Sequence, residues 1–532
     1  MKRIRLLDCT LRDGGYCNNW EFGYENKVRI INGLIESKID IIECGLLTDK
    51  VEYDKNSSCY INISDAENSL LKGANRLYVC LVNYGDYKLE NIPNYNGGVI
   101  EGIRVAFHKS DMKEALDFCA EIMKKGYKVF VQPMVCLNYS ENEYKGLIAK
   151  VNTMCPYAFY IVDSFGTMKR KELLKYISLV NTNLNKEICV GFHSHNNMQM
   201  AFSNAQTFVD ASLEHAVIVD SSIMGMGRGA GNLNTELMIG YLNENFESEY
   251  IVEPLLFVID EVLNSFYERK YWGYSLPNYL SAKHNIHPNY ANFFSEKNTL
   301  TVEDVNKIFL MIEDDKRVSF DKSYAELLYV QYMEEGEENE EKVQEFADML
   351  EDRKVLIIGP GKSSVDEKEK ILAVMQEEGT VSISVNFEYT ERNTDFVFLS
   401  NLKRNRLESL SQPERLIVTS NIPINNSYLK IKYANYLNDI EHVEDNALLM
   451  LIKFLIKIGV ENIILAGIDG YSKDSEKNYA NDRMKLVTSK ETLDGMNSGI
   501  NYMLNKYSEQ CSIKFLTREK YLCIGKENKD ET

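Results

Sequence analysis

Apolar runs that alternate with amphipathic segments fill the first half of the chain. Eight short runs have the length and composition of buried strands, and patterns of helical spacing fill several of the gaps between them. The predicted strands are Ile4–Leu7, Ile39–Cys44, Arg76–Val82, Gly102–Phe107, Tyr127–Val135, Ala158–Asp163, Ile188–Phe192 and Ala216–Asp220. The clearest predicted helices are Lys113–Lys125, Lys171–Leu184 and Met198–Ala211. Eight such units within about 240 residues predict a (β/α)8 TIM barrel, although a doubly wound open sheet could give the same alternation.

Polar side chains collect where these predicted strands end. They are Asp13, Glu43, His108, Asp163, Ser164, His193, His195, Asp220 and Ser221. In a barrel, the carboxyl ends of the parallel strands meet on one face, and the chemistry of this fold takes place there. The sequence therefore predicts one site on that face.

The second half returns to strands and helices after a mainly helical stretch. Its predicted strands are Lys354–Pro360, Val381–Val385, Phe396–Ser400, Arg415–Thr419, Asn462–Ala466 and Ser512–Leu516, with helices at Lys368–Glu377 and Asn446–Ile458. This pattern predicts a second α/β domain with a Rossmann-like sheet. Since 532 residues exceed a single core, we expect the barrel at 1–245, a helical post-barrel region at 246–332, an acidic linker at 333–352 and the Rossmann-like domain, of unknown ligand, at 353–532.

The charge of the chain limits the classes of partner that we expect. The formal net charge is −19, and six glutamates crowd the segment from Glu334 to Glu341. An acidic chain without a basic arm argues against nucleic acid and anionic membranes as partners. No stretch has the apolar length of a membrane span, and the opening residues do not have the pattern of a signal peptide or anchor. The 11 cysteines are scattered without a C-x-x-C pair, as is typical of reduced thiols in a cytoplasmic protein.

Two motifs supply residue types suited to a metal site. In L-D-C-T-L-R-D-G-G-Y, Asp13 can ligate a hard cation while Arg12 holds an anionic oxygen beside it; the alternative is a salt-bridged strand end before a Gly-Gly turn. In G-F-H-S-H-N-N, His193 and His195 lie two residues apart on an extended segment and point to the same side. With Asp13 they would form a two-histidine, one-carboxylate set with open positions for substrate oxygens.

A third motif is the glycine-rich loop S-S-I-M-G-M-G-R-G-A-G-N, which ends at Asn232. Glycines such as Gly227 and Gly229 let the backbone approach a ligand closely, although a tight turn into the next helix explains them equally. Asn232 could cap that helix or add an oxygen to the metal site. We expect Glu43, Asp163 and Ser164, together with the two glycines, to bind substrate.

Together, these motifs and I-V-D-S-F-G resemble the DRE-TIM metallolyase (HMGL-like) superfamily, most closely the 4-hydroxy-2-oxovalerate aldolases, over about residues 3–242. The resemblance implies that Asp13, His193 and His195 bind Mn²⁺ or Mg²⁺, with Asn232 in or near this set, and that Arg12 stabilises an enolate. It implies a carbon–carbon lyase whose small-molecule substrates are pyruvate, or a close 2-oxo acid, and an aldehyde. The alternatives are acyl-CoA-dependent Claisen chemistry of the same superfamily and a non-catalytic metal-binding scaffold.

The chain departs from this family at the proton-transfer group. The aldolases carry a histidine just after R-D-G, where Gly15 and Tyr16 stand here, and the catalytic cysteine of the related lyases is also missing. Candidates for the acid or base are Tyr16, a metal-bound water, and His284 or His287 from an aromatic segment after the barrel. That segment could instead serve helix packing, close the barrel mouth, or form the subunit interface of an expected homo-oligomer.

The motifs of the second half do not identify a family. G-P-G-K-S-S follows a predicted strand but is not a phosphate loop. The pattern G-x-x-x-x-G-K would need a glycine at position 356, where the chain has Leu356. A glycine turn at a helix N-terminus can still hold a phosphate. We therefore consider Gly359, Gly361, Lys362 and Asp469 as a nucleotide or nucleotide-sugar site, with an ordinary strand-to-helix turn as the alternative.

Overall fold

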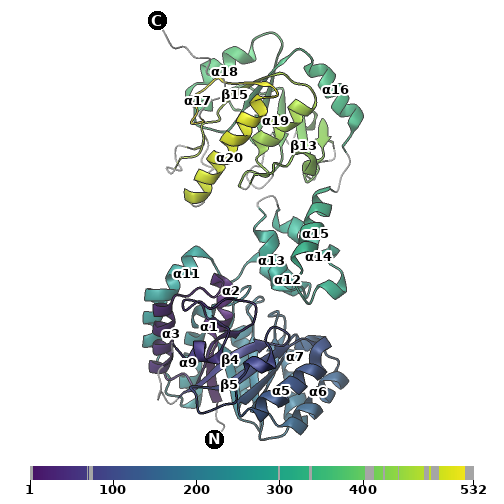
Figure 1. The fold of residues 1–532 in the computed structure, drawn as a ribbon. Helices are drawn as coiled ribbons and strands as arrows, with labels where there is room; N and C mark the ends of the chain where they lie inside the picture. Colours follow the sequence, from purple (N-terminus) through teal and green to yellow (C-terminus); the bar gives the residue numbers. More distant parts are fainter. Residues whose placement is uncertain are drawn as a thin grey trace. The chain divides into compact units, whose positions relative to one another are not determined.

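The computed structural model divides into two compact units, Met1–Asp321 and Lys322–Thr532. It describes residues 4–68, 70, 76–297, 300–334, 338–401, 412–422, 424, 426–440, 442–472, 478–480 and 490–521. Figure 1 shows the two units, each built from strands and surrounding helices. Among the described residues, no helix has both the length and the apolar character needed to cross a membrane.

The first unit contains a closed barrel of eight parallel strands. They are β1 (Ile4–Asp8), β2 (Ile41–Leu47), β4 (Leu77–Asn83), β5 (Ile100–Phe107), β6 (Lys128–Pro133), β7 (Ala158–Asp163), β8 (Cys189–Ser194) and β9 (Val217–Ser221). β1 pairs with both β9 and β2, which closes the sheet, and a two-residue strand, β3 (Cys59–Tyr60), extends the edge of β2. The predicted (β/α)8 barrel and its eight strands are confirmed, with ends that shift by a few residues.

Helices cover most of the strand connections on the outside of the barrel. They are α3 (Tyr24–Glu36), α4 (Ile63–Glu67), α5 (Met112–Lys124), α6 (Glu141–Met154), α7 (Arg170–Asn183), α8 (Ala201–Asp210) and α9 (Thr235–Phe246). Figure 1 shows α5, α6 and α7 side by side around the strands. The connection from β4 to β5 differs from a regular unit, because it contains only the short 3-10 turn η1 (Leu89–Asn91).

The sequence of α5 explains why this helix forms and packs as it does. Ala115, Leu116, Cys119 and Ile122 recur at helical spacing and are buried, so one stripe of the helix faces the strands. Helix α6 begins at a capping box, in which the Ser140 hydroxyl accepts a hydrogen bond from the backbone N–H of Glu143. The apolar spacing within α5 and the capping residues of α6 therefore favour helices in the same places where the folded barrel has them.

Short helices follow the barrel within the first unit. They are α10 (Glu253–Val258), the π-helical turn η5 (Ile259–Leu263), α11 (Asn264–Arg269), α12 (Leu276–Lys283), α13 (Pro288–Ser295) and α14 (Val302–Met311). Helix α10 packs on α3, whose Gly33 lies against Val258. The next helices are α15 (Lys322–Glu334) and α16 (Glu340–Leu350), and within the acidic stretch Glu335 and Glu337 lie outside the described residues.

The second unit is an open parallel sheet with helices. In chain order its strands are β10 (Lys354–Ile358), β11 (Thr380–Val385), β12 (Phe396–Leu399), β13 (Leu416–Thr419), β14 (Leu429–Ile431), β15 (Asn462–Ala466) and β16 (Ser512–Phe515). Their spatial order is β14-β13-β12-β11-β10-β15-β16, so the chain changes direction across the sheet between β10 and β15. Besides α15 and α16, the described helices of this unit are α17 (Ser363–Asp366), α18 (Lys368–Met375), α19 (Ala447–Lys457) and α20 (Lys490–Ser508), of which α19 and α20 pack together. The predicted α/β class of this half is confirmed.

Candidate metal centre

Asp13, His193 and His195 lie together at the carboxyl end of the barrel strands. Asp13 ends the one-turn helix α1 (Thr10–Asp13) that directly follows β1. His193 belongs to β8, and His195 follows that strand, where it forms a bridge with Asn232. The short turn after β1 and the extended end of β8 thus bring residues about 180 positions apart in sequence to one point.

The geometry of the three side chains suits a cation. Asp13 Oδ2 lies 3.7 Å from His193 Nε2 and 3.6 Å from His195 Nε2, and one ligand atom from each residue lies within 4.8 Å of the others. Both oxygens of Asp13 are buried; Oδ1 is paired with Arg12 NH1 at 3.0 Å, whereas no described residue donates a hydrogen bond to Oδ2. A buried carboxylate oxygen without a donor is costly unless a positive charge satisfies it, so Oδ2 and the two histidines could hold a divalent cation.

His193 and His195 each place Nε2 within 3.7 Å of Asp13 Oδ2. His193 Nδ1 lies 3.0 Å from Asp220 Oδ2, which leaves Nε2 directed toward Asp13. This is the carboxylate–histidine arrangement that orients metal ligands. Burial lowers the pKa of His195 to about 3 despite the neighbouring Asp13 carboxylate. Burial also opposes the charge of Asp13, but Arg12 and the two histidines hold its pKa below the usual value.

A buried network of alternating charges joins these groups to Arg12. Arg12 NH1 lies 3.0 Å from Asp13 Oδ1, and Arg12 Nε donates to Glu43 Oε2 at 2.8 Å. Arg104 NH1 lies 2.9 Å from Glu43 Oε1, and Arg104 NH2 donates to Asp220 Oδ2. Since Asp220 contacts His193 and His193 faces Asp13, the contacts form a closed ring of six side chains, Asp13, Arg12, Glu43, Arg104, Asp220 and His193.

Arg104 is fully buried at the centre of this network. Burial opposes its charge, but Asp220 and Glu43 raise its pKa above the ordinary value of 12.5. Its guanidinium also lies over the ring of Tyr160, which donates to Asp220 Oδ1 at 3.0 Å, and Gln132 accepts from Arg104 Nε at 2.9 Å. The interior of the barrel is therefore a charged, hydrogen-bonded frame beneath the site.

Asn232 lies beside the metal set, and its Oδ1 atom is buried without a donor among the described residues. Its Nδ2 atom donates to Met226 O at 3.2 Å, and a Cβ on Gly227 would lie 2.2 Å from the same Nδ2. Gly229 has φ +69°, and a Cβ there would lie 2.6 Å from Asn197 Oδ1. The two glycines thus let the loop pass close to these amides, and Asn232 Oδ1 could be a further cation ligand.

Glu43, Asp163 and Ser164 are buried and have partners within the chain. Glu43 bonds the two arginines of the ring. The Asp163 carboxylate accepts from the backbone N–H groups of Thr167 and Met168, and burial raises its pKa to about 7. Ser164 Oγ accepts from the backbone N–H of Val135 at 2.9 Å. Asp163 and Ser164 thus hold the loops at the barrel mouth in the ligand-free chain.

Tyr16 and His287 both contact Arg228 of the glycine-rich loop. Tyr16 belongs to the short helix α2 (Gly15–Asn18), and its ring packs against Arg228 and, at 4.7 Å, against Trp20. Arg228 NH1 lies 3.2 Å from Nε2 of His287, which caps the N-terminus of α13. His284 lies elsewhere and bonds Asn306 at 2.9 Å. Of the two histidines after the barrel, His287 is therefore the one at the site.

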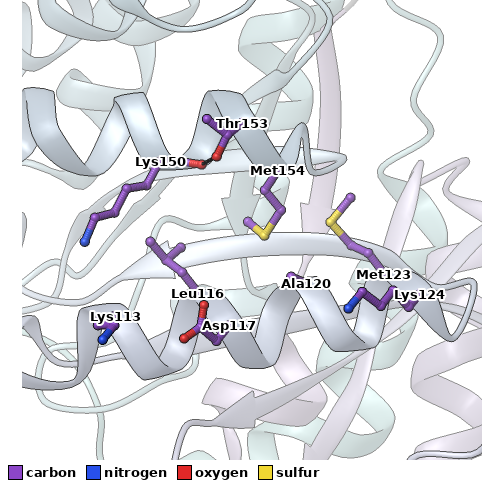
Figure 2. Close-up of a pocket in the computed structure, with 9 residues that line it drawn as sticks. All are labelled: Lys113, Leu116, Asp117, Ala120, Met123, Lys124, Lys150, Thr153 and Met154. Carbon is purple, nitrogen blue, oxygen red and sulfur yellow. Dashed lines mark hydrogen bonds between the residues drawn. The ribbon is translucent and has the colours of Figure 1, made fainter.

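The cavities on the barrel unit include a small one near the barrel mouth and a larger groove on its outside. One, of about 360 Å³, is lined by residues that follow β6 and β7, including Ser164 and Phe165, and by the end of α12 with Lys283. The other, of about 700 Å³, is a groove between α5 and α6, and Figure 2 shows Leu116 and Met154 pointing into it. The groove contains none of the predicted site residues, whereas the smaller cavity borders the site.

In the second unit, Asp469 fills the turn that was considered for a phosphate. It accepts from the backbone N–H and hydroxyl groups of Ser363, the first residue of α17. A Cβ on Gly359 or on Gly361 would lie within 2.7 Å of Gly467 O. The glycines therefore allow the ends of β10 and β15 to meet closely, and the side chain of Lys362 is exposed. The nucleotide or nucleotide-sugar site at this turn stays a prediction.

Three residues of the site could not be assigned a role from the sequence alone. Arg104 carried a signal, because a charged residue inside an apolar strand must have buried partners. From the sequence, Asp220 is only one of the polar residues at the strand ends, and Arg228 is only one residue of the glycine-rich motif. Their roles depend on contacts with distant segments, which one sequence does not display.

Comparison with known proteins shows which proteins the barrel unit is similar to. A family model described as HMGL-like matches residues 104–249. The 4-hydroxy-2-oxovalerate aldolase of Pelotomaculum thermopropionicum is 29% identical over 249 residues, covering 45% of this chain and 70% of the relative. That of Geobacillus genomosp. 3 is 25% identical over 269 residues, covering 48% and 78%. An oxaloacetate decarboxylase of Mycobacterium tuberculosis is 25% identical over 240 residues, covering 44% and 69%. The resemblance predicted from the motifs is confirmed: this chain carries an HMGL-like domain of the DRE-TIM superfamily at residues 104–249, within its barrel unit.

Proposed function

We propose that the barrel is a divalent-metal-dependent aldolase, which adds a pyruvate-type enolate to an aldehyde or removes it. The observation that carries this proposal is the buried Asp13 carboxylate, which faces two histidines on one side and Arg12 on the other. The similarity to proteins named 4-hydroxy-2-oxovalerate aldolase supports the same chemistry. Cleavage of a 4-hydroxy-2-oxo acid and decarboxylation of oxaloacetate both leave the enolate of pyruvate, so the relatives with different names point to one intermediate.

Asp13, His193 and His195 would hold the cation, with Asn232 Oδ1 beside them. When bound, Mn²⁺ or Mg²⁺ would act as a Lewis acid toward the oxygens of the 2-oxo acid.

Arg12 would stabilise the enolate oxygen. Its Nε and NH1 atoms are bonded to Glu43 and Asp13, so the plane of the guanidinium is fixed before substrate arrives. Its remaining N–H donors are then available to an oxygen that gains negative charge as the methyl proton leaves. In the addition, the enolate carbon forms a bond with the aldehyde carbon, and the aldehyde oxygen takes up a proton. Tyr16 and His287 are the side-chain candidates for moving that proton.

Hydrogen exchange tests the enolate directly. With Mn²⁺ present, the protein in heavy water should replace the methyl hydrogens of pyruvate by deuterium, which NMR detects. Replacing Arg12 by lysine should slow this exchange roughly 100- to 1000-fold, because one preorganised donor to the oxyanion is lost. Mn²⁺ binding, followed by electron paramagnetic resonance, separates loss of the metal from loss of enolate stabilisation. Wild-type protein that binds Mn²⁺ but exchanges no 2-oxo acid would exclude the proposed function.

A further inference from the structure

Arg228 is held at the barrel mouth by three segments that are far apart in the sequence. Its guanidinium carbon lies 5.3 Å from the centre of the Tyr16 ring in α2. Its NH1 lies 3.2 Å from Nε2 of His287, at the start of α13, and its NH2 donates to Ser164 O, just after β7, at 3.5 Å. The three contacts fix the guanidinium in one place.

All three partners of Arg228 are uncharged. Burial and the nearby Arg228 charge lower the pKa of His287 well below 6.5, so its imidazole is neutral near pH 7. Across the described part of the chain, no carboxylate oxygen lies within 4.0 Å of the Arg228 guanidinium, and Arg228 Nε is buried without an acceptor. A partly buried cation in this position lacks the counter-anion that would offset its desolvation.

The other two arginines of the site show the contrast. Arg12 is paired with Asp13 and Glu43, and Arg104 is paired with Glu43 and Asp220. Their charges are balanced inside the chain, so they need no anion from outside. Arg228 alone of these three presents an unbalanced charge.

The place of Arg228 is suited to a second substrate. It lies four residues before Asn232, and its charge lowers the pKa of both Asp13 and His195. The cavity of about 360 Å³ includes Ser164, whose carbonyl Arg228 bonds, and Phe165, whose ring packs on His287 at 5.9 Å. The cavity therefore borders two residues that contact Arg228 and His287.

We propose that Arg228 binds an anionic group, a carboxylate or a phosphate, on the aldehyde that reacts with the enolate. This assignment rests on the proposed aldolase function and adds the charge class of its second substrate. A guanidinium recognises both anions by paired N–H donors.

Matched aldehydes test the assignment. The probes are 4-oxobutanoate against butanal for the carboxylate, and glyceraldehyde 3-phosphate against glyceraldehyde for the phosphate, each with pyruvate and Mn²⁺. In wild-type protein, kcat/KM for one anionic probe should exceed that for its neutral partner. In Arg228→Gln this ratio should fall roughly ten- to hundredfold, the loss expected for a charge-assisted hydrogen bond, and Arg228→Lys should retain part of it. Because each ratio compares two substrates of one variant, a general loss of activity cancels. The pair that shows the preference identifies the anion.

Lys283→Gln provides the matched control. Lys283 is an exposed cation that lines the same cavity, so its removal changes the local charge equally. The ratio of kcat/KM for the anionic probe to that for its neutral partner should stay within about twofold of wild type, because exposed ion pairs contribute little to binding. A ratio near one in wild-type protein for both pairs, or a ratio lost in Lys283→Gln and kept in Arg228→Gln, would overturn the assignment.

A binding measurement separates this proposal from the proposed function. Ligand-observed NMR with protein and Mn²⁺, but without pyruvate, should show tighter binding of the preferred anionic probe than of its neutral partner, with the difference lost in Arg228→Gln. If wild-type protein fails to exchange pyruvate hydrogens but passes this test, the aldolase function fails while the anion site stands. Equal binding of both members of each pair refutes the anion site whether or not exchange occurs.

Discussion

A Cβ atom on Gly15 would lie 2.0 Å from Cδ1 of Trp20, so the indole occupies the space in which a side chain at position 15 would begin. Trp20 Nε1 donates to the backbone carbonyl of Arg12 at 2.8 Å, and the Trp20 ring packs against Tyr16. The aldolases that this chain resembles carry a histidine just after R-D-G. Here Trp20 supports the Arg12 turn from the same place, which accounts for the absence of a side chain at Gly15.

Gly15→Ala should destabilise the barrel unit by about 1–3 kcal/mol, because the indole must move. Urea unfolding measures this cost. In a Trp20→Ala background the same substitution should cost less than 1 kcal/mol, since the space is then free and the helical backbone of α2 accepts alanine. Equal costs in the two backgrounds would show that Trp20 does not constrain Gly15.

Metal affinity should depend on Asp13 directly and on Asp220 through His193. Asp13→Asn should reduce Mn²⁺ affinity at least 100-fold, because the charged ligand is lost. Asp220→Asn should reduce it roughly 10- to 100-fold, since the His193 ring loses its orienting carboxylate. Calorimetric titration with Mn²⁺ measures both effects. Asp210→Asn, on the outer helix α8, serves as the control and should bind like wild type. Unchanged affinity in Asp13→Asn would place the metal elsewhere.

The contribution of Asp8 to the stability of the barrel unit should fall as pH rises from about 4 to about 6. Burial raises the pKa of Asp8 to about 6, although Thr10 N–H and the Thr235 hydroxyl donate to its carboxylate. A raised folded pKa means that the folded state binds more protons than the unfolded state. The contribution of Asp8 to the free energy of unfolding is therefore fully present below the pKa of Asp8 in the unfolded chain. At most roughly 3 kcal/mol is lost as pH rises through about 6.

Urea unfolding at a series of pH values can isolate this contribution of Asp8. The only two tryptophans, Trp20 and Trp272, both lie in the barrel unit, so their fluorescence reports on that unit. Asp8→Asn should remove this contribution, so that between pH 4 and pH 6 the free energy of unfolding falls less, or rises more, than in wild type. An identical slope in wild type and Asp8→Asn would assign the pH dependence to other groups.

Gly467 should be less tolerant of substitution than Gly459. Both have positive φ, +67° and +89°, so alanine is strained at either position. A Cβ on Gly467 would also lie 2.2 Å from Gly359 O, whereas nothing lies within 4 Å of a Cβ on Gly459. Gly467→Ala should therefore cost about 1–3 kcal/mol more than Gly459→Ala. Hydrogen exchange of β10 and β15 peptides measures the difference, and similar protection in the two variants would contradict the close approach.

Residues whose role depends on local spacing could be predicted from the sequence. His193 and His195 alternate along one strand, and Asp13 follows another, so their meeting at one end of a barrel follows from strand geometry. The eight barrel strands were recognisable for the same reason, since each is a mainly apolar run of strand length. β14, a three-residue strand, was missed because so short a run has no distinctive period.

Residues whose role depends on long-range contacts could not be predicted. Arg104 bonds Glu43 and Asp220, each more than 50 positions away in sequence, and no local pattern selects those partners. The glycine turn after β10 shows the same limit. The sequence places Asp469 after another predicted strand, but it does not reveal that this carboxylate bonds Ser363 at the end of the turn.

The charged ring draws on the start of the chain and on β2, β5, β8 and β9, whereas Arg228 belongs to the glycine-rich loop between β9 and α9. A change in any ring member must therefore be accommodated by several strands at once. Arg228 is not a member of the ring, so a substitution at this position leaves the ring contacts in place. Under the proposed function, such a substitution would change the acceptor aldehyde while the enolate chemistry is kept.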